Sequence, residues 1–160
     1  MNYERFSQWK AWQARTELDR LHFPGIYALA ISSVNLSDQD FSYIGQIVYF
    51  GMTNSVAGLQ GRLKQFDNTI HEKTGHGGAD RFRHDYPKPI DLLPQLYVAV
   101  LPFECEVSSN APSDLLTMGR VAMADYECFA RYTELFGHLP KYNDKKKSPK
   151  FSRMVRANDS

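Results

Sequence analysis

The feature that most constrains the fold is a strand, strand, helix pattern in the first half of the chain. The apolar run Gly25–Ile31 follows Pro24 and has the length and composition of a short buried strand. A second run of β-branched and aromatic residues, Ile47–Gly51, comes after a polar loop, so the two runs predict an antiparallel pair. Hydroxyl and amide side chains at 53–55 then suit the N-cap of a helix expected from about residue 56 to 68.

Three chemically capable side chains stand on these elements. Tyr27 lies in the first predicted strand and Tyr49 in the second. Arg62 lies on the predicted helix, where Leu59 and Leu63 mark the apolar face. We therefore expect the guanidinium near the edge of the core, facing the sheet.

The sequence Gly25-Ile26-Tyr27, followed by Tyr49-Phe50-Gly51-Met52-Thr53 and by Leu59-x-x-Arg62, resembles the motif of the GIY-YIG nucleases. The resemblance spans about residues 25–143. It implies an α/β (α+β) domain with a central three-stranded, mainly antiparallel sheet flanked by helices, the third strand being expected at 96–101. It also implies a metal-dependent DNA endonuclease that hydrolyses phosphodiester bonds, of a restriction, mobile-element or structure-specific type.

A second tyrosine could occupy the position assigned to Tyr49, because Tyr43-Ile44-Gly45 spells the second family triplet literally. We prefer Tyr49. After Gly45 the chain continues as strand, whereas after Gly51 it turns into the helix that carries Arg62, as the family pattern requires.

In the family a glutamate on a later helix binds the metal ion. The matching helix is expected at about 113–136, started by Asn110 or Ser113 and ended by Gly137. The resemblance points to Glu127 as a catalytic residue and ligand of Mg²⁺ (or Mn²⁺), since a carboxylate among small and apolar neighbours is costly to leave without a cation. Asp125 and Glu134 compete for the role.

Two further positions follow from the resemblance. Asn143, after a proline-containing turn, matches the asparagine that helps to hold the family's active site. One helical turn after Arg62, many members have a histidine or tyrosine, whereas this chain has Phe66, which cannot transfer a proton. Lys64, His71 or His76 could substitute.

Each of these groups would then have its own role in catalysis. Arg62 would bind the scissile phosphate, Tyr27 would accept a proton from the attacking water, and Tyr49 would orient water or phosphate. Poising a phenol near pH 7 requires about 3 pKa units, worth roughly 4 kcal/mol. The alternative is a catalytically silent nucleic-acid-binding module, with Phe66 as its first sign.

Two cationic segments are candidate DNA contacts. Residues 74–84 combine glycines with cations in a predicted flexible loop, although an ordinary turn explains them equally well. The tail predicts a phosphate-contacting arm, its alternative being a solvated terminus. The proposed nucleic-acid-binding residues are Lys64, His76, Arg81, Arg83, Lys145, Lys146, Lys147 and Lys150; Arg153 and Arg156 extend the tail.

The expected organisation is an N-terminal helical extension at 1–22, the nuclease-like domain at 23–143 and a basic tail at 144–160. Trp9 and Trp12 are expected on different faces of the extension. In a chain of 160 residues with 42% hydrophobic content, this is one domain with a proper core.

Composition also indicates where the protein is located and what its cysteines can do. No segment approaches the roughly 18 apolar residues of a membrane span, and the first residues lack the apolar centre of a signal peptide, so we expect a soluble, cytoplasmic protein. Cys105 and Cys128 have neither zinc-site nor redox-pair spacing. Because one site cuts one strand, double-strand scission would favour a homodimer.

Overall fold

The computed structural model describes residues 5–71 and 75–152. Its sheet has four antiparallel strands rather than three, in the order β1-β4-β2-β3. The long strands are β2 (Gly25–Ile31), β3 (Ile47–Thr53) and β4 (Leu96–Pro102), all close to their predicted positions. The additional strand, β1 (Lys10–Ala11), pairs with β4. Because β2 is central, Tyr27 is held by neighbours on both sides.

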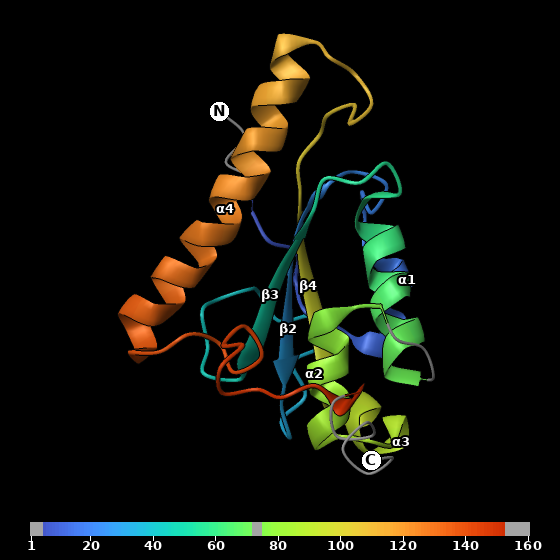
Figure 1. The fold of residues 1–160 in the computed structure, drawn as a ribbon, viewed down its shortest axis with the longest axis vertical. Coiled ribbons are helices and arrows are strands. Elements are labelled where there is room, and N and C mark those ends of the chain that lie inside the picture. The colour runs from blue at the N-terminus through green and yellow to red at the C-terminus, as the bar shows by residue number, and fades with distance from the viewer. Residues whose placement is uncertain (1–4, 72–74, 153–160) are drawn as a thin grey trace.

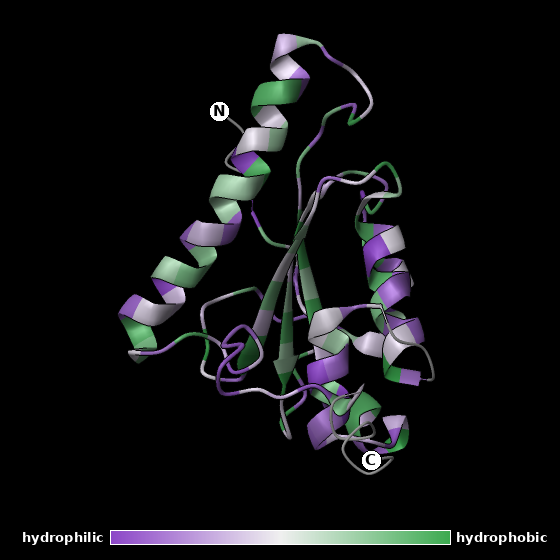
Figure 2. Ribbon diagram, in the orientation of Figure 1, coloured by the Kyte–Doolittle hydropathy of each residue, from purple (hydrophilic) through white to green (hydrophobic). Residues whose placement is uncertain are grey.

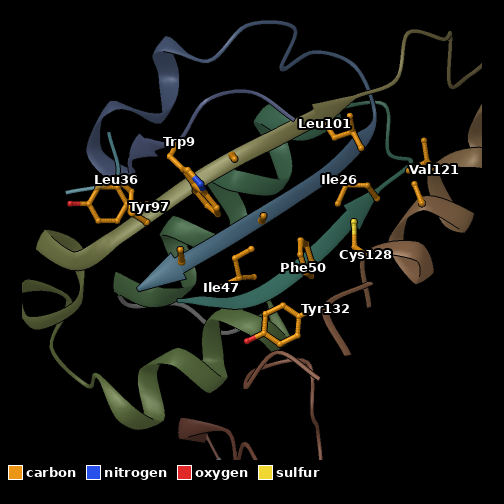
Figure 3. Packing of buried hydrophobic residues seen from close by; sticks show 14 of the residues in the cluster. Trp9, Ile26, Leu36, Ile47, Phe50, Tyr97, Leu101, Val121, Cys128 and Tyr132 are labelled. Atoms are coloured by element: carbon orange, nitrogen blue, oxygen red, sulfur yellow. The ribbon is translucent and has the colours of Figure 1, made fainter. Parts of the chain in front are cut away.

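Helices cover both faces of the sheet (Figure 1). One face packs against α4 (Pro112–Phe136), and the other against α1 (Gly58–His71) and α2 (Gly77–Asp85). Side chains along β2 point alternately to the two faces of the sheet. Ile26 and Ala28 lie in the buried cluster between the sheet and α4, called the α4 core (Figure 3). Tyr27 lies in the buried cluster between the sheet and α1 and α2, called the α1/α2 core. The short α3 (Pro89–Leu92) and η2 (Leu93–Gln95) lead into β4.

The prediction of an N-terminal helix is wrong for the described residues. This segment contains the short strand β1 and one 3₁₀ segment, η1 (Trp12–Glu17), and no α-helix among its described residues. Trp9 and Trp12, expected on different faces, are both buried, Trp9 in the α4 core and Trp12 beside Phe66 in the α1/α2 core. The Trp12 indole also donates to Asp67 Oδ1 at 2.8 Å. Extended backbone lets two nearby indoles reach opposite faces of the sheet, which a helix along one face would not do.

Helix starts differ from the sequence prediction because backbone groups replace side-chain caps. The N–H groups of Leu59 and Gln60 in α1 donate to the carbonyls of Phe23 and Leu21, at 2.9 and 2.8 Å. Ala111 is the N-cap of α4, with Pro112 in the first turn, so neither Asn110 nor Ser113 caps the helix. Its predicted end at Gly137 is confirmed, with a left-handed φ of 79°.

Two segments expected to be irregular are ordered. Residues 77–85 of the predicted glycine loop form α2. After α4 the chain crosses back over the edge of β3 and reaches α2 (Figure 1). Tyr142 N–H donates to Val48 O at 2.9 Å, and the Ser152 hydroxyl donates to Asp80 Oδ2 at 2.7 Å. The tail, as far as Ser152, is therefore docked on the domain.

Candidate functional site

The Tyr27 ring lies against Gly51. The two residues are partners in the β2/β3 register, and an ideal Cβ at position 51 would lie 2.2 Å from Tyr27 Cζ. Any larger residue would collide with a ring that is fully buried. The glycine of the second triplet is thus required by the tyrosine of the first.

Tyr49, rather than Tyr43, stands beside Tyr27. The regular β2/β3 register pairs Tyr49 with Leu29, two residues along from the Tyr27–Gly51 pair and therefore on the same face, and the centroids of the Tyr27 and Tyr49 rings are 5.9 Å apart. Tyr43 belongs to the α4 core, where its hydroxyl donates to Cys128 Sγ at 3.7 Å. The geometry therefore favours the Tyr49 alignment. Tyr49 is only half-buried, so it can meet solvent.

His76 completes this cluster from the start of α2. Its ring is 1% exposed, and its Nδ1 accepts a hydrogen bond from Ala79 N–H at 3.2 Å. A neutral imidazole then carries its proton on Nε2, which donates to Tyr27 Oη at 2.8 Å. The phenolic proton of Tyr27 consequently points away from His76, and the Tyr49 ring lies beside it at 5.9 Å between ring centroids. His76 packs edge-on against Phe66, at 5.1 Å between ring centroids, and so provides the polar group that Phe66 lacks.

Arg62 supplies positive charge to all three rings. Its guanidinium acts to lower the pKa of Tyr27, of Tyr49 and of His76. One terminal nitrogen donates to Gln65 Oε1 at 2.7 Å, while the buried Nε has no partner. A guanidinium with an unsatisfied buried donor is suited to an anionic ligand.

Burial decides the protonation state of the cluster. Desolvation raises the pKa of Tyr27 and of Tyr49, and the opposing effect of Arg62 does not outweigh it. Burial, followed by the charge of Arg62, lowers the pKa of His76 to about 3. The phenols and the imidazole are therefore all neutral at pH 7. The lowered tyrosine pKa expected for a phenolic base is absent.

Among the α4 carboxylates, Asp125 rather than Glu127 acts electrostatically on Tyr49. Its charge raises the pKa of Tyr49. Burial raises the pKa of Asp125 itself to about 6, and its buried Oδ1 has no hydrogen-bond partner. An unpaired carboxylate in such a position is costly unless a cation or donor completes it.

The burial inferred for Glu127 from its neighbours in sequence is wrong, because its side chain is exposed. It lines a hollow with Phe103, Arg120 and Met123, and its charge acts on Tyr43 and Cys128 rather than on Tyr49. Two residues along an α-helix correspond to about 200° of rotation, so Glu127 and Asp125 point in opposite directions. Glu134 is also exposed and is paired with Arg131 at 2.7 Å.

Asn143 fixes the backbone of β3 next to Tyr49. Its Oδ1 accepts from Phe50 N–H at 2.9 Å, and its Nδ2 donates to Phe50 O at 2.8 Å. Since β3 is an edge strand, one amide side chain here takes the place of a neighbouring strand. Asn143 thus positions the residues that flank the tyrosine without touching it.

The expected DNA-contacting cations are divided among several surfaces. Arg81 and Lys150 lie together at the start of α2: a Cβ at Gly77 would be 3.3 Å from Arg81 Nη1 and 3.6 Å from Lys150 Nζ. Arg81 also lowers the pKa of Tyr49, so this pair adjoins the cluster. Arg83 stacks on Phe151, and Lys64 lines a separate hollow beside Asp67. Lys145, Lys146 and Lys147 are exposed, His76 is buried, and Arg153 and Arg156 lie outside the described residues.

The side chains that could bind a metal ion can be compared with the ligands that such an ion requires. In residues 5–71 and 75–152, no group of three or more His, Cys, Asp or Glu side chains forms a complete protein cage. Asp125 offers one partly desolvated carboxylate with an unpartnered oxygen, which suits Mg²⁺ held by one protein ligand, waters and substrate oxygens. The residues therefore fit a hard cation with most of its coordination sphere open.

Comparison with family models, with curated proteins and with solved structures gave no match. Along the described part of the chain, no helix combines the length and apolarity needed to cross a membrane.

For two residues of this site, the role predicted from the sequence differs from the position found in the structure. From the sequence, His76 is expected chiefly as a DNA contact, and Asp125 as an alternative to Glu127. A signal for Asp125 was present in the helical phase of α4, since it adjoins the buried stripe of Val121, Cys128 and Tyr132 whereas Glu127 lies across the helix from it. His76 lies seven residues beyond Thr69, whose hydroxyl accepts a hydrogen bond from His76 N–H at 3.3 Å, and this long-range contact had no sequence signal.

Proposed function

We propose that this chain is a metal-dependent DNA endonuclease of the GIY-YIG type, which hydrolyses phosphodiester bonds. The observation that carries the proposal is the convergence of two neighbouring phenols, Tyr27 and Tyr49, with the unsatisfied guanidinium of Arg62. Asp125 adds a carboxylate with an unpartnered oxygen close to Tyr49. Together these groups could bind a phosphate, orient a water and hold a cation.

Arg62 binds the scissile phosphate in this mechanism. Its planar guanidinium donates two parallel hydrogen bonds to phosphate oxygens and stabilises the negative charge that grows there. Lysine carries a similar charge without the fork of donors, so Arg62→Lys should lower the rate of cleavage strongly.

Tyr49 orients the attacking water, because its half-buried ring reaches solvent whereas Tyr27 is fully buried. Tyr27 accepts a hydrogen bond from His76, which fixes the direction of its own hydroxyl. As water attacks phosphorus, its proton passes to Tyr49 Oη while the hydroxyl proton of Tyr49 moves on to bulk water. This relay requires no phenolate, consistent with the raised pKa of both tyrosines.

Asp125 would hold the divalent cation. When bound, the cation supplies Lewis-acid stabilisation of the departing 3′ oxygen. The carboxylate must be ionised to act as a ligand, so its pKa of about 6 predicts loss of activity below that pH.

Arg81 and Lys150 would contact the DNA backbone next to the scissile phosphate. They lie together at the start of α2, and Arg81 is close enough to Tyr49 to influence its pKa. Contacts of this kind hold a duplex in register without reading sequence. DNA binding should accordingly weaken as salt is raised.

The test is incubation of the purified protein with supercoiled plasmid and Mg²⁺ or Mn²⁺, with EDTA as the control. Metal-dependent nicking or linearisation, lost in Arg62→Ala, supports the enzyme. Salt-sensitive retention of DNA without cutting would instead favour a catalytically silent nucleic-acid-binding module. Neither cutting nor retention would reject both.

A further inference from the structure

We propose that Asp80 is a positioning residue, which fastens residues 144–152 to α2 and so completes a phosphate site formed by Arg81 and Lys150. We call residues 144–152 the docked segment. In Figure 1 the chain after α4 crosses to α2, where the described residues end. The anion assigned to this site, a backbone phosphate of DNA, rests on the proposed function.

Asp80 is a buried carboxylate in the first turn of α2, with 5% of its surface exposed. Its Oδ2 accepts a hydrogen bond from the Ser152 hydroxyl at 2.7 Å, and its Oδ1 accepts one from Ser152 N–H at 3.3 Å. We call these two hydrogen bonds the Asp80–Ser152 latch. Burying a carboxylate without donors is costly, so the burial of Asp80 favours the docked position of Ser152.

Polar contacts hold most of the docked segment. Figure 2 shows that the chain reaching α2 from the end of α4 is mostly hydrophilic. The one large apolar side chain in residues 144–152 is Phe151, whose ring centroid lies 4.2 Å from Arg83 Cζ. The Ser148 hydroxyl donates to Asp144 O at 2.5 Å, a bond within the segment that does not tie it to α2. With so little apolar surface to bury, attachment to α2 depends strongly on the latch.

The latch places Lys150 beside Arg81. A Cβ at Gly77 would lie 3.3 Å from Arg81 Nη1 and 3.6 Å from Lys150 Nζ, so the absence of a side chain at Gly77 leaves the space between the two cations open. Arg81 Nη1 donates to Gly77 O at 2.9 Å, and its buried Nε has no partner. Within the described part of the chain, neither cation forms an ion pair with a carboxylate. Two neighbouring cations of this kind are suited to an anion.

This pair of cations borders the candidate active site. A Cβ at Gly78 would lie 2.7 Å from Tyr49 Cζ, and the charge of Arg81 acts to lower the pKa of Tyr49. A phosphate held between Arg81 and Lys150 would therefore lie close to the tyrosine that orients the attacking water. The latch thus acts on the substrate through Lys150 and does not touch it.

Loss of the latch should weaken DNA binding although it removes no cation. Asp80→Ala takes away a negative charge, and by charge alone it should strengthen the attraction to a polyanion. If the latch holds Lys150 in place, the variant should instead bind DNA about three- to tenfold more weakly, as expected for the loss of one phosphate contact. The latch and simple electrostatics therefore predict changes of opposite sign.

Fluorescence anisotropy of a short labelled duplex in EDTA measures this binding without cleavage. Asp80→Ala, Ser152→Ala and Lys150→Gln should weaken binding to a similar extent, whereas Ser152→Thr keeps the hydroxyl and should bind like wild type. Ser152→Ala leaves every residue of α2 in place, so a loss shared with Asp80→Ala does not come from damage to the helix. The matched control is Asp91→Asn, an exposed acid on α3, which should bind at least as tightly as wild type.

Salt dependence distinguishes a lost phosphate contact from a general loss of structure. Between about 50 and 200 mM salt, the slope of log K against log salt should fall by about one in each of the three weakened variants. The double variant Asp80→Ala with Lys150→Gln should bind no more weakly than Lys150→Gln alone, because both changes remove the same contact.

Hydrogen exchange of the Ser152 amide tests the latch without DNA. The amide should exchange faster in Asp80→Ala than in wild type, because its acceptor is lost. Unchanged exchange, or DNA binding that is unchanged or tighter in both Asp80→Ala and Ser152→Ala, would overturn this inference and leave the proposed function standing. Wild-type protein that retains no DNA at low salt would overturn both.

Discussion

Tyr27 fills the space above Gly51 on the neighbouring strand, so closely that an ideal Cβ at position 51 would lie 2.2 Å from the tyrosine ring. The ring cannot move away, because it is fully buried and hydrogen-bonded to His76. The two triplets of the motif are therefore one packing unit, in which the glycine makes room for the tyrosine.

Gly51→Ala should consequently destabilise the fold by roughly 1–3 kcal/mol, the usual cost of overpacking. Urea denaturation measures the change. Gly119→Ala is the control, since that glycine lies in a helix with open space around its Cα, and alanine there should stabilise by about 0.5–1 kcal/mol. A Gly51→Ala protein as stable as wild type would mean that Tyr27 does not hold the position described.

Tyr27→Phe should cost about 1–3 kcal/mol, because it leaves the buried Nε2–H of His76 without an acceptor. Tyr49→Phe should cost less, since the half-buried Tyr49 can exchange its partners with water. A double-mutant cycle between Tyr27→Phe and His76→Phe checks the pairing. Strictly additive losses would show that the two side chains are not coupled.

Asp125→Asn should stabilise the protein at pH 7 by about 1–2 kcal/mol, after allowance for solvent screening. Because the folded pKa, about 6, is above the ordinary 3.8, the folded state keeps a proton that the unfolded state has lost. Stability contributed at this position thus falls as pH rises from about 4 to 6. Thermal melts across this range should show a smaller decline in Asp125→Asn than in wild type, and a less stable variant at pH 7 would refute the prediction.

The contribution of His76 to folding stability should have the opposite pH dependence. Its pKa is lowered to about 3 from the ordinary 6.5, so below pH 6.5 the unfolded chain takes up a proton that the folded state refuses. Stability should therefore fall with decreasing pH, by at most about 1.4 kcal/mol per pH unit from this residue. His76→Gln should flatten that part of the stability curve. An unchanged slope would indicate that the imidazole is solvated.

Asn143→Ala should loosen the edge strand beside Tyr49. Loss of both hydrogen bonds to Phe50 should cost about 1–3 kcal/mol and speed hydrogen exchange of the Phe50 amide. Asn110→Ala, at an exposed asparagine that caps no helix, is the matched control and should change neither. Equal exchange at Phe50 in both variants would count against the role of Asn143.

The three long strands, α1 and α4 could be predicted because their signals are local. Apolar runs of strand length, glycine punctuation and helical spacing depend on a few neighbouring residues. The N-terminal segment could not be predicted in this way, because its extended form comes from pairing of Lys10 and Ala11 with β4, far along the chain. Residues 77–85 form a helix despite two glycines, and Gly78 is needed there because a Cβ would lie 2.7 Å from the Tyr49 ring.

The candidate site was likewise predictable where it lies on those elements. Tyr27, Tyr49 and Arg62 come together, and Asn143 holds β3 as the resemblance implied. The exposure of Glu127 could not be predicted from the chain around it, because sequence neighbours of a helical residue are not its spatial neighbours. Docking of the tail on Asp80 depends on two contacts from Ser152 and could not be read from the charge run.

The most direct test of the account is nicking of supercoiled plasmid in Mg²⁺ by wild type, Asp125→Asn and Glu134→Gln. Glu134 is an exposed carboxylate on the same helix and is already paired with Arg131. We expect wild type and Glu134→Gln to nick at equal rates, and Asp125→Asn to lose activity although it folds at least as stably. Nicking by Asp125→Asn at the wild-type rate, or none by any of the three proteins, would contradict the proposal.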